Sequence, residues 1–478
     1  MSPVNPKPDA ALKPLPDGTR RLTVREKIAY GIGSANDAWG NWLLPGIVWP
    51  VFNMYLGMSP TMVSLALLWN RLIDAFADPF FGWASDNTRS RYGRRRPYIL
   101  VGSILSGLGM IAFFWFIQKG WSPGAYYWYL MIGSSILLIL VSCFNMPYQS
   151  LGAEMTPDYE ERTSVFAFRG GLQKIAEIGN FAAAAFITLH FFQGDILYGA
   201  KIYSIIIGVL MIVVGITTFA GVKERYYGKV ANQERVGLIE TFVGALKCPP
   251  FRAQLAMALS YGIGTSMVGA LGYYTTVYYV CRGDIALGSK WNLAMGAATV
   301  VVGFLGVPFF ARLAHRYSKR KAMIVVILSS IVVFASSWFL YTPAVQWLQL
   351  VAAGFIAFTQ AAFWMLYGAI GADVIDYDEW ETGKRREGAF SACGSYLMKV
   401  GLAIGLGSSG YVLEYTGFDA KLGAAQLPEA LDRIRLFLVI IPIIGLILAL
   451  VFLLRCGLTR ERSEQIRREL EARRGAVV

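Results

Sequence analysis

RLFLVIIPIIGLILALVFLL, residues 435–454, carries one arginine at its first position and no other charge in twenty residues. An α-helix of about 20 apolar residues is long enough to cross a lipid bilayer. A second run, KAMIVVILSSIVVFASSWFL at 321–340, has the same character. The whole chain of 478 residues is 55% hydrophobic and 16% charged, whereas soluble domains carry about 25% charged residues. The sequence therefore predicts an all-α protein that crosses the lipid bilayer several times.

Twelve transmembrane helices are expected, and an even number places both termini on the same side of the membrane. Of the 44 Lys and Arg residues, 32 fall in segments on the side of the termini and 7 on the opposite side. Positive charge collects in cytoplasmic loops, so both termini are predicted to be cytoplasmic, with the chain in the plasma (inner) membrane. This asymmetry accounts for the net charge of +13 without a nucleic-acid partner. The expected spans are 28–56, 62–85, 97–118, 125–150, 163–191, 201–222, 251–280, 290–313, 321–342, 346–371, 387–416 and 434–455.

Short motifs recur between the two halves of the chain. YGIGS (30–34) returns as YGIGT (261–265), and MPYQSLGAE (146–154) returns as MLYGAIGAD (365–373). Parallel repeats of six spans place a binding site at their interface, near the middle of the bilayer. The predicted organisation is an N-terminal cytoplasmic tail (1–27), a six-helix bundle (28–222), a cytoplasmic linker (223–250), a second six-helix bundle (251–455) and a C-terminal cytoplasmic tail (456–478).

The stretch WNRLIDAFADPFFGW (69–83) places charged residues inside an expected span. Arg71, Asp74 and Asp78 are spaced to share one helix face. Each charge at the centre of a span costs about 2.5–3.5 kcal/mol on insertion scales, so charges within the spans are expected to face a shared interior and neutralise one another. The eight ionisable residues within the spans are Asp37, Arg71, Asp74, Asp78, Arg169, Lys174, Glu177 and Lys399.

Asp74 and Asp78 predict a site for the coupling cation. Adjacent carboxylates supply oxygen ligands for a hard cation such as Na⁺, and each raises the proton affinity of the other, so either Na⁺ or H⁺ fits. Lys399 has no partner on its own helix and is either a mobile ammonium that replaces the departing cation or a fixed counter-ion. The structural alternative is a static Arg71–Asp74 ion pair that holds helices together. For Lys174 and Glu177, three residues apart, an intrahelical pair is the favoured interpretation.

A second set of residues suits a sugar. Carboxylate, guanidinium and amide groups hydrogen-bond vicinal hydroxyls, and an indole face packs on the C–H surface of a sugar ring. Each tryptophan alone is equally consistent with packing or with the lipid interface. The predicted substrate-binding residues are Asp37, Trp39, Asn145, Gln149, Arg169 and Trp364.

Basic residues crowd the cytoplasmic loop SDNTRSRYGRRRP (85–97). They anchor the loop on the cytoplasmic side, and they are also predicted to gate transport by pairing with carboxylates in 154–162 and 373–381. The predicted gating residues are Arg89, Arg91, Arg94, Arg95, Arg96, Asp158, Glu161 and Asp376.

Motifs for enzyme chemistry or a bound cofactor are not found. The five cysteines form no CxxC motif, so neither a disulfide framework nor a metal site is expected beyond Na⁺ at Asp74 and Asp78. Only two histidines are present, and no phosphate-binding glycine–lysine motif indicates ATP-driven transport.

The stretch IDAFADPFFGWASDNTRSRYGRRRPYILVG (73–102) resembles the glycoside–pentoside–hexuronide:cation symporters of the major facilitator superfamily, a family that includes the melibiose permeases. The likeness extends through YGIGSANDAW (30–39), FNMPYQSLGAEMTPDYEERT (144–163) and ADVIDYDEWETGKRREGAFSA (372–392). It implies the major facilitator fold, with two six-helix bundles that alternate access to a central site.

The resemblance also implies roles at single positions. Asp74 and Asp78 match the cation-binding carboxylates, Ser142 matches a threonine near the cation, and Lys399 matches a lysine beside that site. Asp37 and Arg169 match the pair that grips sugar hydroxyls, and Trp364 matches a tryptophan of the sugar pocket. Three positions depart from the melibiose carriers: Asn145 replaces an aspartate, Gln149 a tryptophan, and Ala77 an asparagine beside the cation.

The expected function is therefore symport of a sugar or glycoside, with a hexuronide among the candidates, driven by Na⁺ or H⁺ in a monomeric carrier. Two alternatives stay open at this point. One is a cation-coupled carrier of a non-sugar substrate such as a lipid, which needs a lateral apolar cleft. The other is a sensor of the same fold that binds without transporting.

Overall fold

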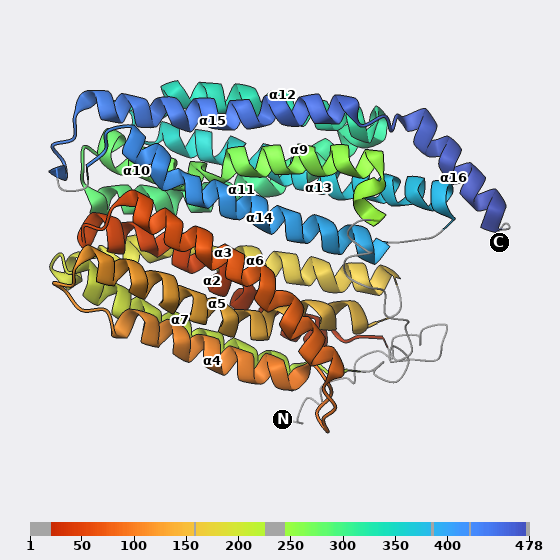
Figure 1. Ribbon diagram of the computed structural model, residues 1–478, viewed down its shortest axis with the longest axis horizontal. Helices are drawn as coiled ribbons and strands as arrows, with labels where there is room; N and C mark the ends of the chain where they lie inside the picture. Colours follow the sequence, from red (N-terminus) through yellow and green to blue (C-terminus); the bar gives the residue numbers. More distant parts are fainter. Residues whose placement is uncertain (1–20, 157–158, 225–243, 384–386, 420–421, 475–478) are drawn as a thin grey trace, which may run out of the picture.

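The computed structural model describes residues 21–156, 159–224, 244–383, 387–419 and 422–474, and every regular element among them is a helix (Figure 1). The predicted tail 1–27 and linker 223–250 lie mostly outside these residues, as does the predicted gating residue Asp158. Within the described part of the chain, the all-α prediction is confirmed.

The helices form two groups, one before and one after residues 225–243 in the sequence (Figure 1). The first group contains α1 (Val24–Ile32), α2 (Ser34–Val48), η1 (Trp49–Tyr55), α3 (Pro60–Asn87), α4 (Arg96–Trp115), α5 (Pro123–Glu154), α6 (Tyr159–Ile187), η2 (His190–Phe192) and α7 (Ile196–Gly221). The second contains α9 (Pro249–Ser266), α10 (Val268–Tyr274), η3 (Thr275–Val280), α11 (Ile285–Arg316), α12 (Lys319–Leu340), α13 (Leu348–Thr382), α14 (Glu387–Tyr415), α15 (Pro428–Arg455) and α16 (Arg460–Arg474).

Local sequence signals begin several of the long helices. Helices α3 and α5 both start with Ser-Pro, in which Ser59 and Ser122 cap the first turn by accepting a backbone N–H through their hydroxyl oxygens. Proline follows as the first helical residue, where its missing N–H costs nothing. Asp195 and Asp284 cap α7 and α11 in the same way.

The repeat in the sequence is also visible in the backbone. The first expected span is divided into α1, α2 and the π-helix η1, and the seventh is divided into α9, α10 and the π-helix η3. Tyr30 of YGIGS stacks on Tyr148 with ring centroids 4.7 Å apart. Tyr261 of YGIGT stacks on Phe363 at 3.6 Å. The duplicated motif thus makes the same kind of contact in each half.

Nine helices of the described residues are long and apolar enough to cross a membrane. The three remaining expected spans coincide with α1–α2–η1, α3 and α6. The first has Asn36, Asp37, Asn41 and Asn53 among its apolar residues, and the other two carry the charges discussed above. The total of twelve spans stays a prediction.

The two groups of helices meet along α3 with α14 and along α6 with α11. Close approach is possible because α14 presents glycines to α3. A Cβ added at Gly410 would clash with Ser64 and Pro60, and one at Gly407 would clash with Leu68. At one end of the molecule, the buried Tyr274 hydroxyl donates a hydrogen bond to Asn53 Oδ1 across the same interface.

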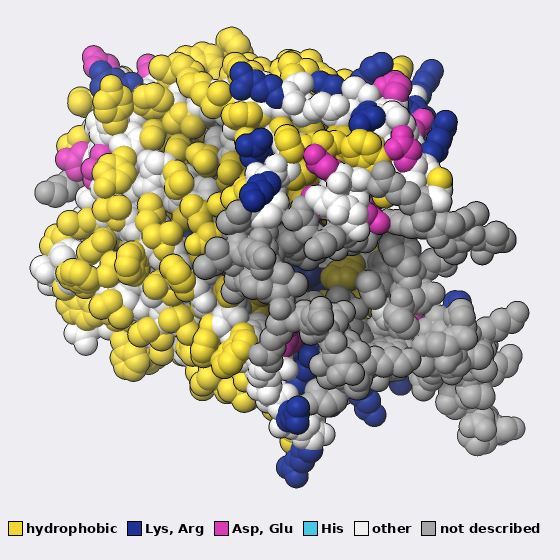
Figure 2. Space-filling view, turned by 45° about the vertical axis from the view of Figure 1, so that its right-hand side comes forward, with side chains coloured by type: hydrophobic (Ala, Val, Ile, Leu, Met, Phe, Trp, Pro, Cys, Tyr) yellow, Lys and Arg dark blue, Asp and Glu magenta, His cyan; other side chains and the backbone are white. Residues whose placement is uncertain are grey.

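The outer surface of the helix bundle is largely apolar, as expected for a surface that contacts lipid. Figure 2 shows hydrophobic side chains over the side of the bundle, whereas Lys, Arg, Asp and Glu gather toward its ends. Helix α16 lies at one of these ends (Figure 1). It buries Ile466 and Leu470 in the same apolar cluster as Val374 of α13, and the Trp380 indole donates a 2.5 Å hydrogen bond to Glu469. This helix lies in the predicted C-terminal tail, for which no element was expected.

Helices α4 and α7 provide a test of the packing. A Cβ added at Gly208 would lie 2.5 Å from the Gly107 carbonyl oxygen, whereas one added at Gly82 of α3 would meet no heavy atom within 4 Å. We expect Gly208→Leu to force α4 and α7 apart at a cost of about 3 kcal/mol or more, and to lower the melting temperature in detergent. Gly82→Leu is the matched control, and equal melting temperatures for the two variants would contradict this packing.

Candidate functional site

Three charged residues of α3 lie on its buried face. Arg71, Asp74 and Asp78 are 6, 5 and 8% exposed, and their spacing places them on one side of the helix. Another side of α3 presents Phe80 and Trp83, which are 57 and 62% exposed. The two carboxylates therefore point into the protein and away from lipid.

Lys399 of α14 lies between the two carboxylates. Its ammonium nitrogen is 3.1 Å from Asp74 Oδ2 and also pairs with Asp78 Oδ2. The lysine comes from the second group of helices and the aspartates from the first, so this three-residue ion cluster joins the two halves of the molecule. The predicted meeting of Lys399 with the acidic pair is thus present in the described state.

Asp74 has two further neighbours. Ser142 of α5 donates a hydrogen bond of 3.3 Å to Asp74 Oδ1, and the Arg71 guanidinium lies 3.9 Å from Asp74 Oδ2. Arg71 also donates a 2.7 Å hydrogen bond to the Asn41 carbonyl oxygen and lies over the Trp42 ring at 5.1 Å. Arg71 therefore connects α3 to α2 as well as pairing with Asp74.

Asp37 of α2 and Arg169 of α6 form the second ion pair, with Arg169 Nη2 3.1 Å from Asp37 Oδ2. The Asn41 side chain donates a 2.9 Å hydrogen bond to the other oxygen of Asp37. Arg169 also lies over the Tyr148 ring at 5.5 Å. The predicted sugar-binding pair is thus held in a fixed orientation before any ligand arrives.

The two ion clusters are joined by one polar path. It runs from Lys399 to Asp74, through Arg71 and Asn41 to Asp37, and ends at Arg169. Arg71 bonds the backbone carbonyl oxygen of Asn41, and the side-chain amide of Asn41 bonds Asp37, so a single residue separates the two ion clusters. The six ionised groups on and beside this path, Arg71, Arg169, Lys399, Asp37, Asp74 and Asp78, sum to zero net charge.

Asn145 and Gln149 lie one turn apart on α5. Asn145 is 3% exposed, and its side-chain oxygen has no hydrogen-bond partner among the described residues. Most buried polar atoms do have a partner, so this oxygen is available to a donor on a ligand. Gln149 is only half-buried, with no hydrogen bond of its side chain among the described contacts.

The two predicted tryptophans differ in their surroundings. Trp39 is buried, and its indole N–H donates a 2.9 Å hydrogen bond to the Ala176 carbonyl oxygen, so this side chain fastens α2 to α6. Trp364 of α13 is 38% exposed and meets Tyr261 edge-on. It lines a cavity of about 420 Å³ between α6, α11 and α13. Of the two, only Trp364 faces space that a ligand can occupy.

The same cavity contains the Lys174–Glu177 pair, whose charged atoms are 2.7 Å apart. A pair with this spacing stabilises a helix by about 0.2–0.5 kcal/mol, whereas each charge within a span costs about 2.5–3.5 kcal/mol. The predicted intrahelical pair is present, but its mutual attraction is too small to account for two charges at this depth.

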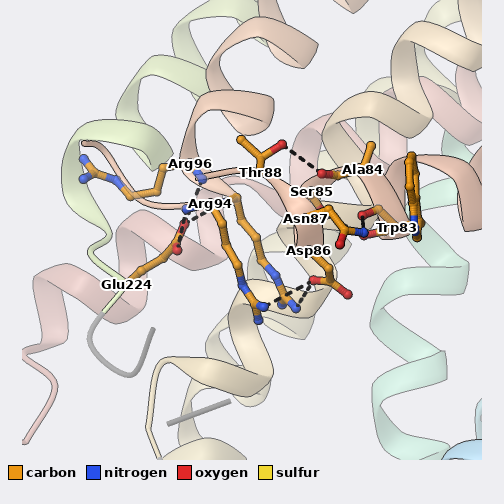
Figure 3. Close-up of polar contacts among 11 residues, drawn as sticks. Trp83, Ala84, Ser85, Asp86, Asn87, Thr88, Arg94, Arg96 and Glu224 are labelled. Carbon is orange, nitrogen blue, oxygen red and sulfur yellow. Dashed lines mark hydrogen bonds and ion pairs between the residues drawn. The ribbon is translucent and has the colours of Figure 1, made fainter. Parts of the chain in front are cut away.

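The basic loop between α3 and α4 is organised by two carboxylates (Figure 3). Glu224 accepts hydrogen bonds from the backbone N–H groups of Arg94, Arg95 and Arg96, at 2.7 to 2.9 Å. The Arg95 side chain lies 2.9 Å from Asp86, and that of Arg94 lies 3.7 Å from it. These contacts all lie within the first group of helices.

The predicted gating pairs stay a prediction beside these contacts. Asp86 and Glu224 lie outside the two acidic stretches expected to supply the partners. Of the predicted carboxylates, Glu161 accepts hydrogen bonds from the Leu22 N–H and the Thr156 hydroxyl, and Asp376 lines a second cavity, beside α16. Arg89 and Arg91 are exposed. Arg94, Arg95, Glu161 and Asp376 make further contacts besides these.

Comparison with known proteins identifies the family. The model of the MFS/sugar transport protein family matches residues 30–460. The chain belongs to this family. It is therefore a transporter of the major facilitator superfamily and not an enzyme, and the resemblance to glycoside–pentoside–hexuronide:cation symporters is confirmed.

Three relatives show that the similarity extends over most of both chains. The isoprimeverose transporter of Lactiplantibacillus pentosus is 26% identical, over 83% of this chain and 81% of that one. The glucuronide carrier protein homolog of Escherichia coli is 24% identical, over 95 and 97%. The inner membrane symporter YicJ of E. coli is 24% identical, over 94 and 95%.

Solved structures show the fold. A bacterial homolog of the human lysosomal transporter Spinster, in an inward-facing and unoccupied conformation, has a TM-score of 0.70 at 12% identity, with 93% of this chain and 99% of that one covered. The nucleoside transporter NupG has a TM-score of 0.63 at 14% identity, with 92 and 100% covered. The transporter thus has the major facilitator fold.

The Lys399 cluster predicts how single and double substitutions will change the stability of this transporter. Lys399→Met removes the ammonium that pairs with both buried carboxylates and leaves Arg71, 3.9 Å from Asp74, as the neighbouring cation. Breaking a buried ion pair in this way costs about 3–5 kcal/mol. We expect a lower melting temperature in detergent at neutral pH. Adding Asp78→Asn removes one of the two charges and should restore much of the loss.

The exposed Lys321 at the start of α12 offers the control variant Lys321→Met, which is expected to melt like the wild type. A double variant no more stable than Lys399→Met alone would show that the cluster does not behave as a buried ion group.

Glu224 gives a separate prediction for the basic loop. Glu224→Ala leaves three backbone donors without their acceptor, and hydrogen bonds to a charged group are worth about 1.5–3 kcal/mol each. We expect faster tryptic cleavage after Arg94 and Arg95 in the folded transporter. Glu429→Ala, at an 86% exposed side chain on α15, is the control, and an unchanged cleavage rate in Glu224→Ala would refute this role.

Proposed function

We propose that this transporter is a secondary active symporter that moves a sugar or glycoside inward together with Na⁺ or H⁺ by alternating access. The observation that carries the proposal is the polar path from Lys399 to Arg169. It links the residues expected to bind the cation, through Arg71 and Asn41, to those expected to bind the sugar. The names of relatives, a symporter and carriers of isoprimeverose and glucuronides, support the same class of cargo.

Charge balance explains the coupling. In the described state, the Lys399 ammonium occupies the space between Asp74 and Asp78. A cation that enters there adds one positive charge to a neutral network in a low-dielectric interior. The least costly response is for the ammonium to leave the carboxylates, because like charges repel strongly at such distances. The arriving cation thereby breaks an ion cluster that joins the two halves.

The sugar is proposed to bind at the other end of the path. Asp37 and Arg169 present an acceptor and a donor that are already oriented, and the side-chain oxygen of Asn145 is free to accept a hydrogen bond from a sugar hydroxyl. The amide of Asn145 carries no charge to repel an anionic sugar. A hexuronide is therefore proposed as one substrate class.

The membrane arrangement is part of the same proposal. We assign twelve spans, with α1–α2–η1, α3 and α6 crossing the membrane despite their charges, because those charges face the interior. The basic loops support a cytoplasmic location for both termini. The protein is assigned to the inner membrane as a monomer. The charged lining of the cavity beside Trp364 counts against a lipid as cargo.

Uptake into proteoliposomes tests the proposal. A panel of labelled glycosides is offered with and without a Na⁺ gradient and at two pH values. At least one sugar should accumulate above its external concentration when one of the ion gradients is imposed. Failure of every sugar under both gradients would end the symport proposal.

A variant at the cation site gives the sharper prediction. Asp78→Asn keeps the shape of the side chain but removes a charge that the cation requires. We expect gradient-driven accumulation to fall to the equilibrium level, while counterflow exchange of the same sugar continues. Asp432→Asn changes an exposed carboxylate on α15 and should accumulate sugar as the wild type does. Full accumulation by Asp78→Asn would show that this carboxylate does not couple the cation.

A further inference from the structure

Helix α2 lacks one of its own hydrogen bonds at the residue that joins the two ion clusters. Pro45 lies inside this helix. Proline has no backbone N–H, so the carbonyl oxygen of Asn41, four residues earlier, loses its usual helical donor. A carbonyl in a protein interior needs another donor to replace it. The backbone of α2 is therefore less restrained by its own hydrogen bonds at Asn41 than a regular α-helix is.

Arg71 supplies the missing donor from the neighbouring helix. Its Nη2 atom donates a 2.7 Å hydrogen bond to the Asn41 carbonyl oxygen, whereas its Nη1 atom lies 3.9 Å from Asp74 Oδ2. The shorter contact is thus to the backbone of α2, although Asp74 is the charged acceptor. The guanidinium also lies over the ring of Trp42, with 5.1 Å to the centroid. Arg71 is therefore shared between helix α2 and the expected cation site.

The side chain of Asn41 makes the contact with the expected sugar pair. Its amide donates a 2.9 Å hydrogen bond to Asp37 Oδ1, while Arg169 lies 3.1 Å from Oδ2. Each oxygen of Asp37 thus has one partner. Because the carbonyl and the amide belong to the same residue, the bond from Arg71 to the backbone of Asn41 also fixes the position from which the amide reaches Asp37.

We propose that Asn41 is a positioning residue that couples the cation site to the sugar site through Arg71, and that Pro45 permits this by freeing the Asn41 carbonyl. The inference rests on the proposed symport and assigns its coupling to one turn of α2. Neither ion cluster includes Asn41, and its side chain carries no charge.

The charge at Asp74 sets how firmly Arg71 holds α2. Asp74 and the Asn41 carbonyl compete for the same guanidinium. A cation bound at Asp74 offsets the negative charge of that carboxylate and weakens its attraction for Arg71. Arg71 then bonds Asn41 more firmly, and Asp37 is held more firmly in the orientation that binds sugar. By linkage, a bound sugar raises the affinity for the cation by the same factor.

Binding to the purified transporter in detergent tests the coupling. Labelled methyl glycosides of glucose, xylose and glucuronic acid are titrated in NaCl and in choline chloride, each at two pH values. In the wild type, the coupling cation should lower the Kd of at least one glycoside about tenfold. Asn41→Ala removes the amide that holds Asp37, and Pro45→Ala gives the Asn41 carbonyl an intrahelical donor. In both variants the effect of the cation should shrink to about twofold or less.

A second measurement separates lost coupling from a damaged site. The cation is titrated without sugar and followed by the fluorescence of Trp42, taken as the difference between each protein and the same protein with Trp42→Phe. In Asn41→Ala, Arg71 and the carboxylates keep their contacts. The half-saturating cation concentration should therefore stay within about twofold of the wild type, whereas a general structural defect would weaken the binding of cation and sugar alike.

Two control variants match the test substitutions. Asn180→Ala removes an amide of α6 that donates a 3.3 Å hydrogen bond to the Ala38 carbonyl oxygen of α2 and contacts neither ion cluster. Pro442→Ala removes a buried proline from the interior of α15. Both controls should keep the full effect of the cation on the Kd of the glycoside.

The outcomes distinguish this inference from the proposed function. A full cation effect in folded Asn41→Ala would overturn it, as would loss of the effect in Asn180→Ala or Pro442→Ala. A wild type that binds cation and glycoside independently would overturn it as well. If Asn41→Ala does not fold, Pro45→Ala decides, because it keeps every charged and amide side chain of the path. Absence of binding for every glycoside would instead count against the proposed function.

Discussion

The interior of this transporter tolerates charge only where an opposite charge lies beside it. An unpaired ion in such an environment costs several kcal/mol, and the six ionised groups on and beside the path from Lys399 to Arg169 avoid that cost together. Asp74 and Asp78 alone would repel each other, and Lys399 removes the repulsion. The arrangement of α2, α3, α6 and α14 therefore depends on keeping these partners within a few ångströms of one another.

The sequence repeat accounts for the helix arrangement that the two halves share, but not for the unequal distribution of charged residues between them. Both halves begin with a broken helix and an aromatic stack at the repeated tyrosine, Tyr30 or Tyr261. The charges, by contrast, lie almost entirely in the first half. DPFF (78–81) in the first half matches VPFF (307–310) in the second, so Asp78 corresponds to Val307. The second half contributes the lysine and Trp364. The first half thus carries most of the charged groups, and the second half supplies Lys399, the counter-ion of Asp74 and Asp78.

Apolar length and helical spacing predicted most of the helices and the inward face of α3. Helix α13 continues to Thr382, beyond the expected end at residue 371, because hydropathy reports the end of the apolar run rather than the end of the helix. Helix α16 was missed for the same reason, since its sequence is mostly charged.

The partners of charged side chains were harder to predict. Arg71 with Asp74 and Lys174 with Glu177 follow from spacing along one helix. Glu224 lies about 130 residues from the loop it organises, and no periodic pattern connects the two segments. The packing of Trp39 against α6 likewise depends on Gly179, where a Cβ would lie 2.8 Å from the indole nitrogen. Such contacts are set by tertiary packing, which a single sequence does not display.

Two kinds of contact join the halves, and they differ in what can break them. At the end of the molecule that carries η1 and η3, the contact is buried and uncharged: Tyr274 bonds Asn53, and Trp49 meets Tyr274 edge-on. Nearer the middle, the contact is the Lys399 cluster. A cation competes directly for the carboxylates but has no affinity for an aromatic contact. Under the proposed symport, ion binding would act on the charged contact first, and the uncharged end would open only when the freed half repacks. The carboxylates would then be the point at which an ion gradient enters the proposed conformational cycle.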